Sequence, residues 1–171
     1  MGTKRVATMG ILLSLVMVLS VLEHLFIMPF MPPHVKPGLA NIIIMYCVFV
    51  MGGPSAVLLV FMKGLFVLVT RGAVAGLLSM CGGLLSVGVM IALAAVSARR
   101  LGYGLISVCG AVAFNIGQLA VAAFWMATGQ LLVFYFPLLL VSGIVAGLLT
   151  GALLKIVLPL LEKLPPGEVR H

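Results

Sequence analysis

Long apolar runs, separated by short polar, glycine-rich or proline-rich breaks, cover most of the chain. A helix needs about 20 mainly apolar residues to cross a hydrocarbon layer of about 30 Å. Most of the runs approach that length, and their charged residues are concentrated at the ends. The pattern predicts one integral membrane domain over residues 1–171, an all-α bundle of about six transmembrane helices. The approximate bounds are 4–28, 38–51, 55–70, 73–98, 105–128 and 136–161.

The breaks between these runs contain residues that end helices. Residues 29–37 hold four prolines, which cannot continue a helix, and Gly52-Gly53-Pro54 predicts a direct turn. Arg71-Gly72 and Arg99-Arg100 mark the next two turns. The second run is short, so we expect its helix to be the shortest of the six.

The amino-acid composition also indicates that this chain is embedded in a lipid membrane. Hydrophobic residues make up 64% of the 171 positions and charged residues 8%, with a mean hydropathy of +1.37. A soluble domain of this size would need a charged shell. The composition therefore excludes an ordinary soluble protein.

The net charge of +7 arises from ten Lys and Arg against three acidic residues, all of them Glu. Basic residues at the ends of apolar spans are a topology signal, so no nucleic-acid partner is implied. One side of a six-span bundle would hold only Lys36 and Arg71. The other would hold Lys4, Arg5, Arg99, Arg100, Lys155, Lys163 and Arg170. We expect both termini in the cytoplasm, and the protein in a cell membrane, most simply a bacterial plasma membrane.

Glu23 and Lys63 are ionisable residues inside predicted spans, where a charge is costly unless it is paired or faces water. Counted from the outer helix ends, they lie roughly 8 Å and roughly 10 Å deep. Two readings stay open: a structural ion pair, or a ligand site in which Lys63 meets an anion. Lys63, Arg71, Lys36 and His34 favour an anionic ligand.

Uncharged polar residues occupy similar depths in other spans. Asn41, Ser79, Asn115 and Gln118 lie in the outer half or near the middle of their helices. With Glu23 and Lys63, they predict a polar substrate-binding pocket that opens outward beneath the 29–37 loop. The alternative is that such side chains only bond helices together.

Small residues recur at helical spacing. Gly143, Gly147 and Gly151 form one stripe in the last span, which favours close helix packing. Near the N-terminus, Ala7, Gly10 and Ser14 share a face where a partner helix could dock. Internal packing is the alternative for both stripes.

Several motifs are missing from the sequence. It contains no GxxxxGK[ST] phosphate-binding loop and no Asp-rich motif, and we find no nucleophile with a base and an orienting group. Cys47, Cys81 and Cys109 lack CxxC spacing, and His24, His34, Met28, Met31 and Cys47 match no ligand pattern. We therefore expect no enzyme, no cofactor and no metal site.

Three runs resemble a known family: Val35-Lys-Pro-Gly-Leu-Ala-Asn-Ile42, Leu78-Ser-Met-Cys-Gly-Gly-Leu-Leu-Ser86 and Gly110-Ala-Val-Ala-Phe-Asn-Ile-Gly-Gln-Leu119. With Glu23 near the end of the first span, they resemble the Gx transporter family, also labelled heptaprenyl diphosphate synthase component I. That family is similar to the S components of energy-coupling factor (ECF) transporters.

The resemblance implies a six-helix subunit that binds a small nutrient from outside and docks on a membrane T subunit with two ATPase subunits. By position it points to Glu23, Asn41, Lys63, Ser79, Asn115 and Gln118 around the site. The chain departs from the family pattern at Phe114-Asn115, where His-Asn is usual, and at Lys63, where Arg is usual. A membrane accessory protein of isoprenoid or quinone metabolism stays open as the other function.

Overall fold

The computed structural model describes residues 3–27, 38–96, 102–126 and 130–161. Within these ranges the chain is entirely helical, which confirms the predicted fold class. The elements are α1 (Thr3–Leu22), the π-helical turn η1 (Glu23–Ile27), α2 (Leu39–Val50), α3 (Gly53–Arg71), α4 (Ala73–Val96), α5 (Tyr103–Met126) and α6 (Gln130–Leu161).

Two element boundaries differ from the prediction. The first helix is not regular to residue 28, because its hydrogen bonding changes from α to π after Leu22. The last helix begins at Gln130, six residues before the predicted 136, and so contains Pro137 in its interior. Membrane helices tolerate an internal proline, because neighbouring groups and local adjustments satisfy the freed backbone carbonyl.

The short second helix, α2, lies inside the bundle. Its 12 residues extend about 18 Å, too short for a hydrocarbon layer of about 30 Å. Nine of the 12 are buried. The other five helices of the described chain are long and apolar enough to cross a membrane. The chain is therefore a multi-pass membrane protein whose α2 is sheathed by protein.

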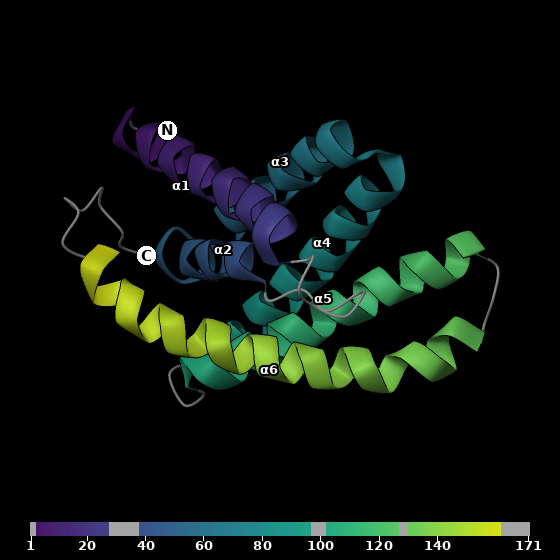
Figure 1. Cartoon of the computed structure of the whole chain (residues 1–171). Coiled ribbons are helices and arrows are strands. Elements are labelled where there is room, and N and C mark those ends of the chain that lie inside the picture. Colours follow the sequence, from purple (N-terminus) through teal and green to yellow (C-terminus); the bar gives the residue numbers. More distant parts are fainter. Residues whose placement is uncertain (1–2, 28–37, 97–101, 127–129, 162–171) are drawn as a thin grey trace.

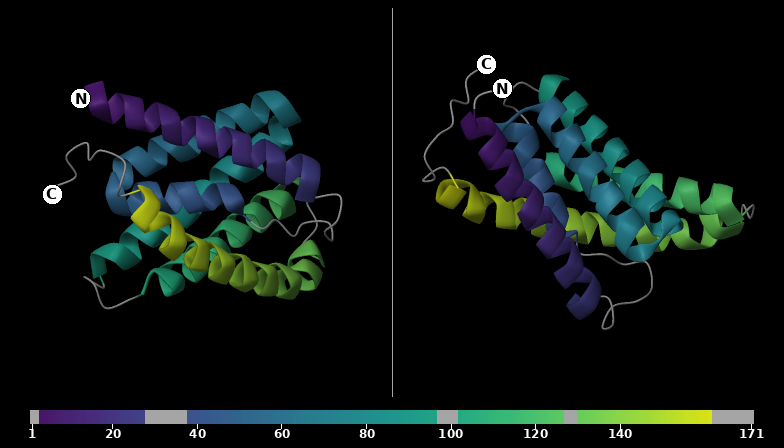
Figure 2. Two further views of the ribbon diagram at one scale, coloured as in Figure 1. Left: turned by 60° about the vertical axis from the view of Figure 1, so that its left-hand side comes forward. Right: turned by 90° about the horizontal axis from the view of Figure 1, so that it is seen from above.

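Successive helices pack side by side from α3 to α6, and α5 and α6 form the most extensive pair (Figure 1). The start of α1, the α2–α3 turn and the end of α6 lie at one end of the bundle (Figures 1 and 2). At that end Arg5 Nη2 donates to the Met51 carbonyl at 3.2 Å and to Ser55 Oγ at 3.0 Å. The shared end agrees with an even number of helices, and its assignment to the cytoplasm stays a prediction.

Glycines permit the closest helix contacts. A Cβ built on Gly147 of α6 would lie 2.4 Å from the Val108 Cα of α5, and one on Gly117 of α5 would lie 2.9 Å from the Gly82 Cα of α4. Gly143 and Gly151 likewise face α5. The stripe in the last span therefore packs internally.

Apolar and polar interiors occupy different halves of the bundle. The buried apolar cluster surrounds α2 and takes in residues of the other helices, most of which lie nearer the end where α1 starts: Leu12, Val16, Leu59, Val60, Val87, Met90, Ile106 and Leu154. Toward the opposite end, the same helices turn polar residues inward. The described bundle thus has an apolar interior in one half and a small cavity with polar lining in the other.

Candidate functional site

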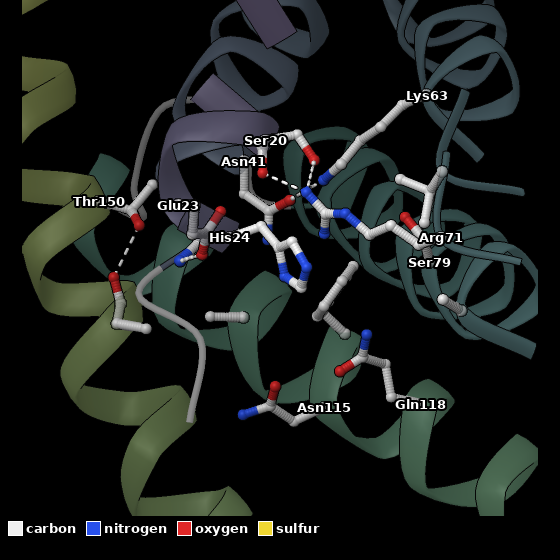
Figure 3. A pocket seen from close by; sticks show the side chains of 16 residues that line it. Ser20, Glu23, His24, Asn41, Lys63, Arg71, Ser79, Asn115, Gln118 and Thr150 are labelled. Carbon is white, nitrogen blue, oxygen red and sulfur yellow. Dashed lines mark hydrogen bonds between the residues drawn. The ribbon is translucent and has the colours of Figure 1, made fainter. Parts of the chain in front are cut away.

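A cavity lies among the helices in the half of the bundle where α1 and α3 end and where α2 and α4 begin (Figure 3). Every helix contributes to its wall. All six residues predicted from the sequence line it, and so do polar residues that were not predicted as site residues. The polar lining comprises Ser20, Glu23, His24, Asn41, Lys63, Arg71, Ser79, Asn115, Gln118 and Thr150.

The α3 part of the wall is a stripe of Lys63, Val67 and Arg71. Residues four apart on a helix share a face, so this spacing aims both cations at the same space. Arg71 Nη2 donates to the carbonyl oxygen of Ser20 and, at 3.3 Å, to Ser20 Oγ. From the sequence, Arg71 was expected to mark a turn and to favour an anionic ligand, but it was not among the predicted site residues. The structure places it in the last turn of α3, directed back into the cavity.

Lys63 is a buried cation, with 7% of its surface exposed. Its Nζ donates to Asn41 Oδ1 at 3.4 Å, near the upper limit for a hydrogen bond. The same Nζ lies 5.7 Å from the centroid of the Phe114 ring, within cation–π range. The face of the Phe114 ring therefore stabilises the ammonium charge beside the Asn41 amide.

Glu23 begins the π-helical turn and fixes the start of α2. Its Oε1 accepts a hydrogen bond from the Gly38 N–H at 2.7 Å. Gly38 has a left-handed φ of 71°, and a Cβ there would lie 3.4 Å from Asn41 Nδ2. The carboxylate also attracts the Arg71 guanidinium. Glu23 therefore joins the end of α1 to the start of α2, and it lines the same cavity as Lys63 and Arg71.

Asn115 faces the cavity and also ties α5 to α6. Its Nδ2 donates to the Leu139 carbonyl at 2.7 Å and to Ser142 Oγ at 3.3 Å. Gly143 makes room for the amide, because a Cβ there would lie 2.9 Å from Asn115 Nδ2. The amide N–H₂ is thus engaged by α6, so Asn115 serves the helix contact as well as the cavity wall.

Ser79 of α4 and Gln118 of α5 complete the predicted set. Figure 3 shows Asn115 and Gln118 on one side of the cavity and Lys63 and Arg71 on the other. A Cβ on Gly82 would lie 2.9 Å from Gln118 Cγ, so the glycine lets this side chain lie close against α4.

Charge and size limit what the cavity can hold. The described lining carries two cations and one carboxylate, a net charge of +1 with His24 neutral. The internal volume is about 60 Å³. Since a water needs at least about 10–15 Å³ by this measure, the space admits a few waters or one small polar group. A larger ligand would require the cations to leave their present acceptors.

The predicted docking residues Ala7, Gly10 and Ser14 lie elsewhere, on an exposed face near the start of α1. Ser14 Oγ donates to the Gly10 carbonyl at 2.9 Å, and a Cβ on Gly10 would meet nothing within 4 Å. The structure leaves this face open, and docking there stays a prediction. The 29–37 loop, Lys36, His34, Met28 and Met31 lie outside the described residues.

Comparison with known families identifies the family of this chain. The family model described as heptaprenyl diphosphate synthase component I matches residues 12–157. The match includes the three runs that carry the resemblance and confirms it. No curated protein and no solved structure matches the chain.

Proposed function

Since the chain belongs to the heptaprenyl diphosphate synthase component I family, we propose that it is the substrate-binding subunit of an ECF-type nutrient-uptake transporter. In this role it takes up a small ligand from the external side and does not catalyse a reaction. A T subunit and two ATPase subunits supply the energy.

The observation that carries this proposal is the division of the bundle into two halves. Polar side chains from all six helices converge on one cavity, while the half nearer the start of α1 is filled by apolar side chains. Polar groups at membrane depth are costly and are kept where they bind something. A bundle with a polar cavity in one half and tight apolar packing in the other suits a protein that receives a solute from one side.

The α1 face of Ala7, Gly10 and Ser14 is the proposed contact with the T subunit. It lies near the end of the bundle that carries Arg5 and Lys155, the proposed cytoplasmic end. Small residues let a partner helix approach closely. A ligand bound in the far half and a partner at this face would not compete for space.

The family description names a synthase component and favours a second candidate, a membrane accessory protein of isoprenoid or quinone metabolism. Such a protein would hold a prenyl lipid or an enzyme without moving a solute. Its binding site would need an apolar channel that is open to lipid. The polar lining of the cavity favours the transporter role.

Purification from the native host in mild detergent separates the two candidates. Mass spectrometry would identify the proteins and small molecules that copurify with the chain. ATPase subunits together with a water-soluble compound are expected. A prenyl lipid or a biosynthetic enzyme, with no ATPase, would replace the transporter role by the accessory role.

A further inference from the structure

Lys63 and Arg71 form the end of the cavity that recognises the charge of the ligand. Resting on the proposed function, we propose that the ligand carries an oxyanion group, a carboxylate or a phosphate, which binds between these two side chains. Its oxygen atoms would take the places of the Asn41 and Ser20 oxygens that accept hydrogen bonds from the two cations.

The two cations converge although they reach the site from different turns of α3. Figure 3 shows both side chains ending beside Ser20 and Asn41. Two like charges that share a poorly hydrated space repel each other, and an anion between them removes the repulsion. Glu23 attracts Arg71, but one carboxylate leaves the described lining with a net positive charge.

The hydrogen-bond acceptors of Arg71 are neutral, and so is Asn41 Oδ1, which accepts from Lys63. Arg71 donates to a backbone carbonyl and a serine hydroxyl, and Lys63 donates to an amide oxygen at 3.4 Å. Hydrogen bonds between charged partners are roughly twice as strong as those with neutral acceptors. An oxyanion can therefore displace Ser20 and Asn41, and the movement of the side chains would enlarge the small cavity.

Arg71 also supplies the geometry that Lys63 lacks. A guanidinium presents paired N–H donors that match a carboxylate or phosphate, whereas an ammonium is a point charge. At Lys63 the site therefore has a charge without paired donors. Arg71, two turns further along the same face, restores a planar donor to the site.

Arg5 provides a matched control for Arg71. Each guanidinium donates to one backbone carbonyl and one serine hydroxyl of other elements, but Arg5 does so at the opposite end of the bundle. Replacing either Arg by Gln removes a charge and comparable hydrogen bonds. Only the loss of Arg71 should change ligand binding.

The test uses the full chain in lipid nanodiscs, incubated at pH 7 with a small-molecule extract of host cells and then washed. Retained solutes are identified by mass spectrometry for the wild type, Arg71→Gln, Arg71→Lys and Arg5→Gln. We expect the wild type and Arg5→Gln to retain the same acid. Arg71→Gln should retain it at least about tenfold less well, with Arg71→Lys between them.

Competition identifies the oxyanion. Release of the retained acid by sodium phosphate, but not by sodium acetate at the same concentration, indicates a phosphate group. Release by acetate but not by phosphate indicates a carboxylate. Release by neither salt would overturn the proposal. So would a neutral or cationic solute, or equal retention by all four proteins; these results would leave the transporter role standing. If the wild type retains no solute, the proposed function itself fails.

Arg71→Lys keeps the test valid if Arg71→Gln does not fold, as judged by gel filtration and circular dichroism. A folded Arg71→Lys protein keeps the positive charge and loses the planar donor pair. Wild-type retention by that variant would show that the charge, and not the planar donor pair, holds the acid, and failure of both salts to release the acid from this variant would overturn the proposal.

Discussion

Gly147 is the position where a single methyl group should separate two helices. A Cβ there would lie 2.4 Å from Val108 Cα, 3.0 Å from Val108 N and 3.1 Å from Ser107 O. All three are backbone atoms of α5, which cannot rotate away as a side chain can. The shortest distance is about 1 Å below ordinary van der Waals contact, so Gly147→Ala must push α5 and α6 apart by a similar amount.

The expected cost follows from two opposing effects. Overpacking a close contact typically costs about 1–3 kcal/mol. Replacing a mid-helix glycine by alanine returns about 0.5–1 kcal/mol. We therefore expect Gly147→Ala to lower the free energy of unfolding by up to roughly 2.5 kcal/mol, with a central value of about 1 kcal/mol. The separation would also strain the Asn115 hydrogen bonds to α6 and so weaken ligand retention.

Gly88→Ala is the control, because Gly88 lies within α4 and a Cβ there would meet nothing within 4 Å. This variant should be neutral or up to about 1 kcal/mol more stable than the wild type. Unfolding can be followed by circular dichroism while detergent micelles are titrated with sodium dodecyl sulfate. If Gly147→Ala and Gly88→Ala are equally stable, the inferred contact between α5 and α6 is wrong.

Three further substitutions test the site and the docking face. Lys63→Met should leave the bundle folded, as judged by gel filtration, but reduce solute retention at least about tenfold, because it removes one of the two cations that bind the ligand. Unfolding would instead make Lys63 a structural residue. Glu23→Gln keeps an acceptor for Gly38 and removes the only carboxylate of the described lining, so the affinity for an acid, measured by titration, should rise several-fold; a lower affinity would contradict the charge argument. Gly10→Leu should prevent copurification of the T subunit without changing solute retention, and unchanged assembly would refute docking at this face.

The helix pattern was predictable because each span is apolar and each break contains glycine, proline or basic residues. The start of α6 was predicted too late because Pro137 is tolerated within the helix. The π-helical turn at Glu23 could not be predicted, since it depends on hydrogen bonds rather than on hydrophobicity. The cytoplasmic position of the termini follows from charge counting and still awaits a topology measurement.

All six polar residues singled out in the sequence line the cavity, because polar side chains at membrane depth have few other places to go. Their binding role stays a prediction. Arg71 was expected to favour an anionic ligand but was left out of the predicted site residues, because it stands beside a turn and was counted as a topology charge. Its spacing of four and eight residues from Val67 and Lys63 was the available signal.

The contacts of Glu23 and Ser20 were beyond sequence reasoning for a different reason. Glu23 binds a backbone N–H of Gly38, and Arg71 binds a backbone carbonyl of Ser20. Backbone groups occur at every position, so no residue type marks them as partners. Helices that are apolar all round also give little sign of which face turns inward.

Retention of a solute by a protein with a blocked cavity tests the central claim most directly. Ala111 lines the cavity, whereas Ala120 lies on the exposed side of the same helix. After incubation with host extract, the wild type and Ala120→Phe should retain one water-soluble compound, and a folded Ala111→Phe should retain none. Equal retention by all three proteins, or no retention by the wild type, would contradict a substrate-binding cavity.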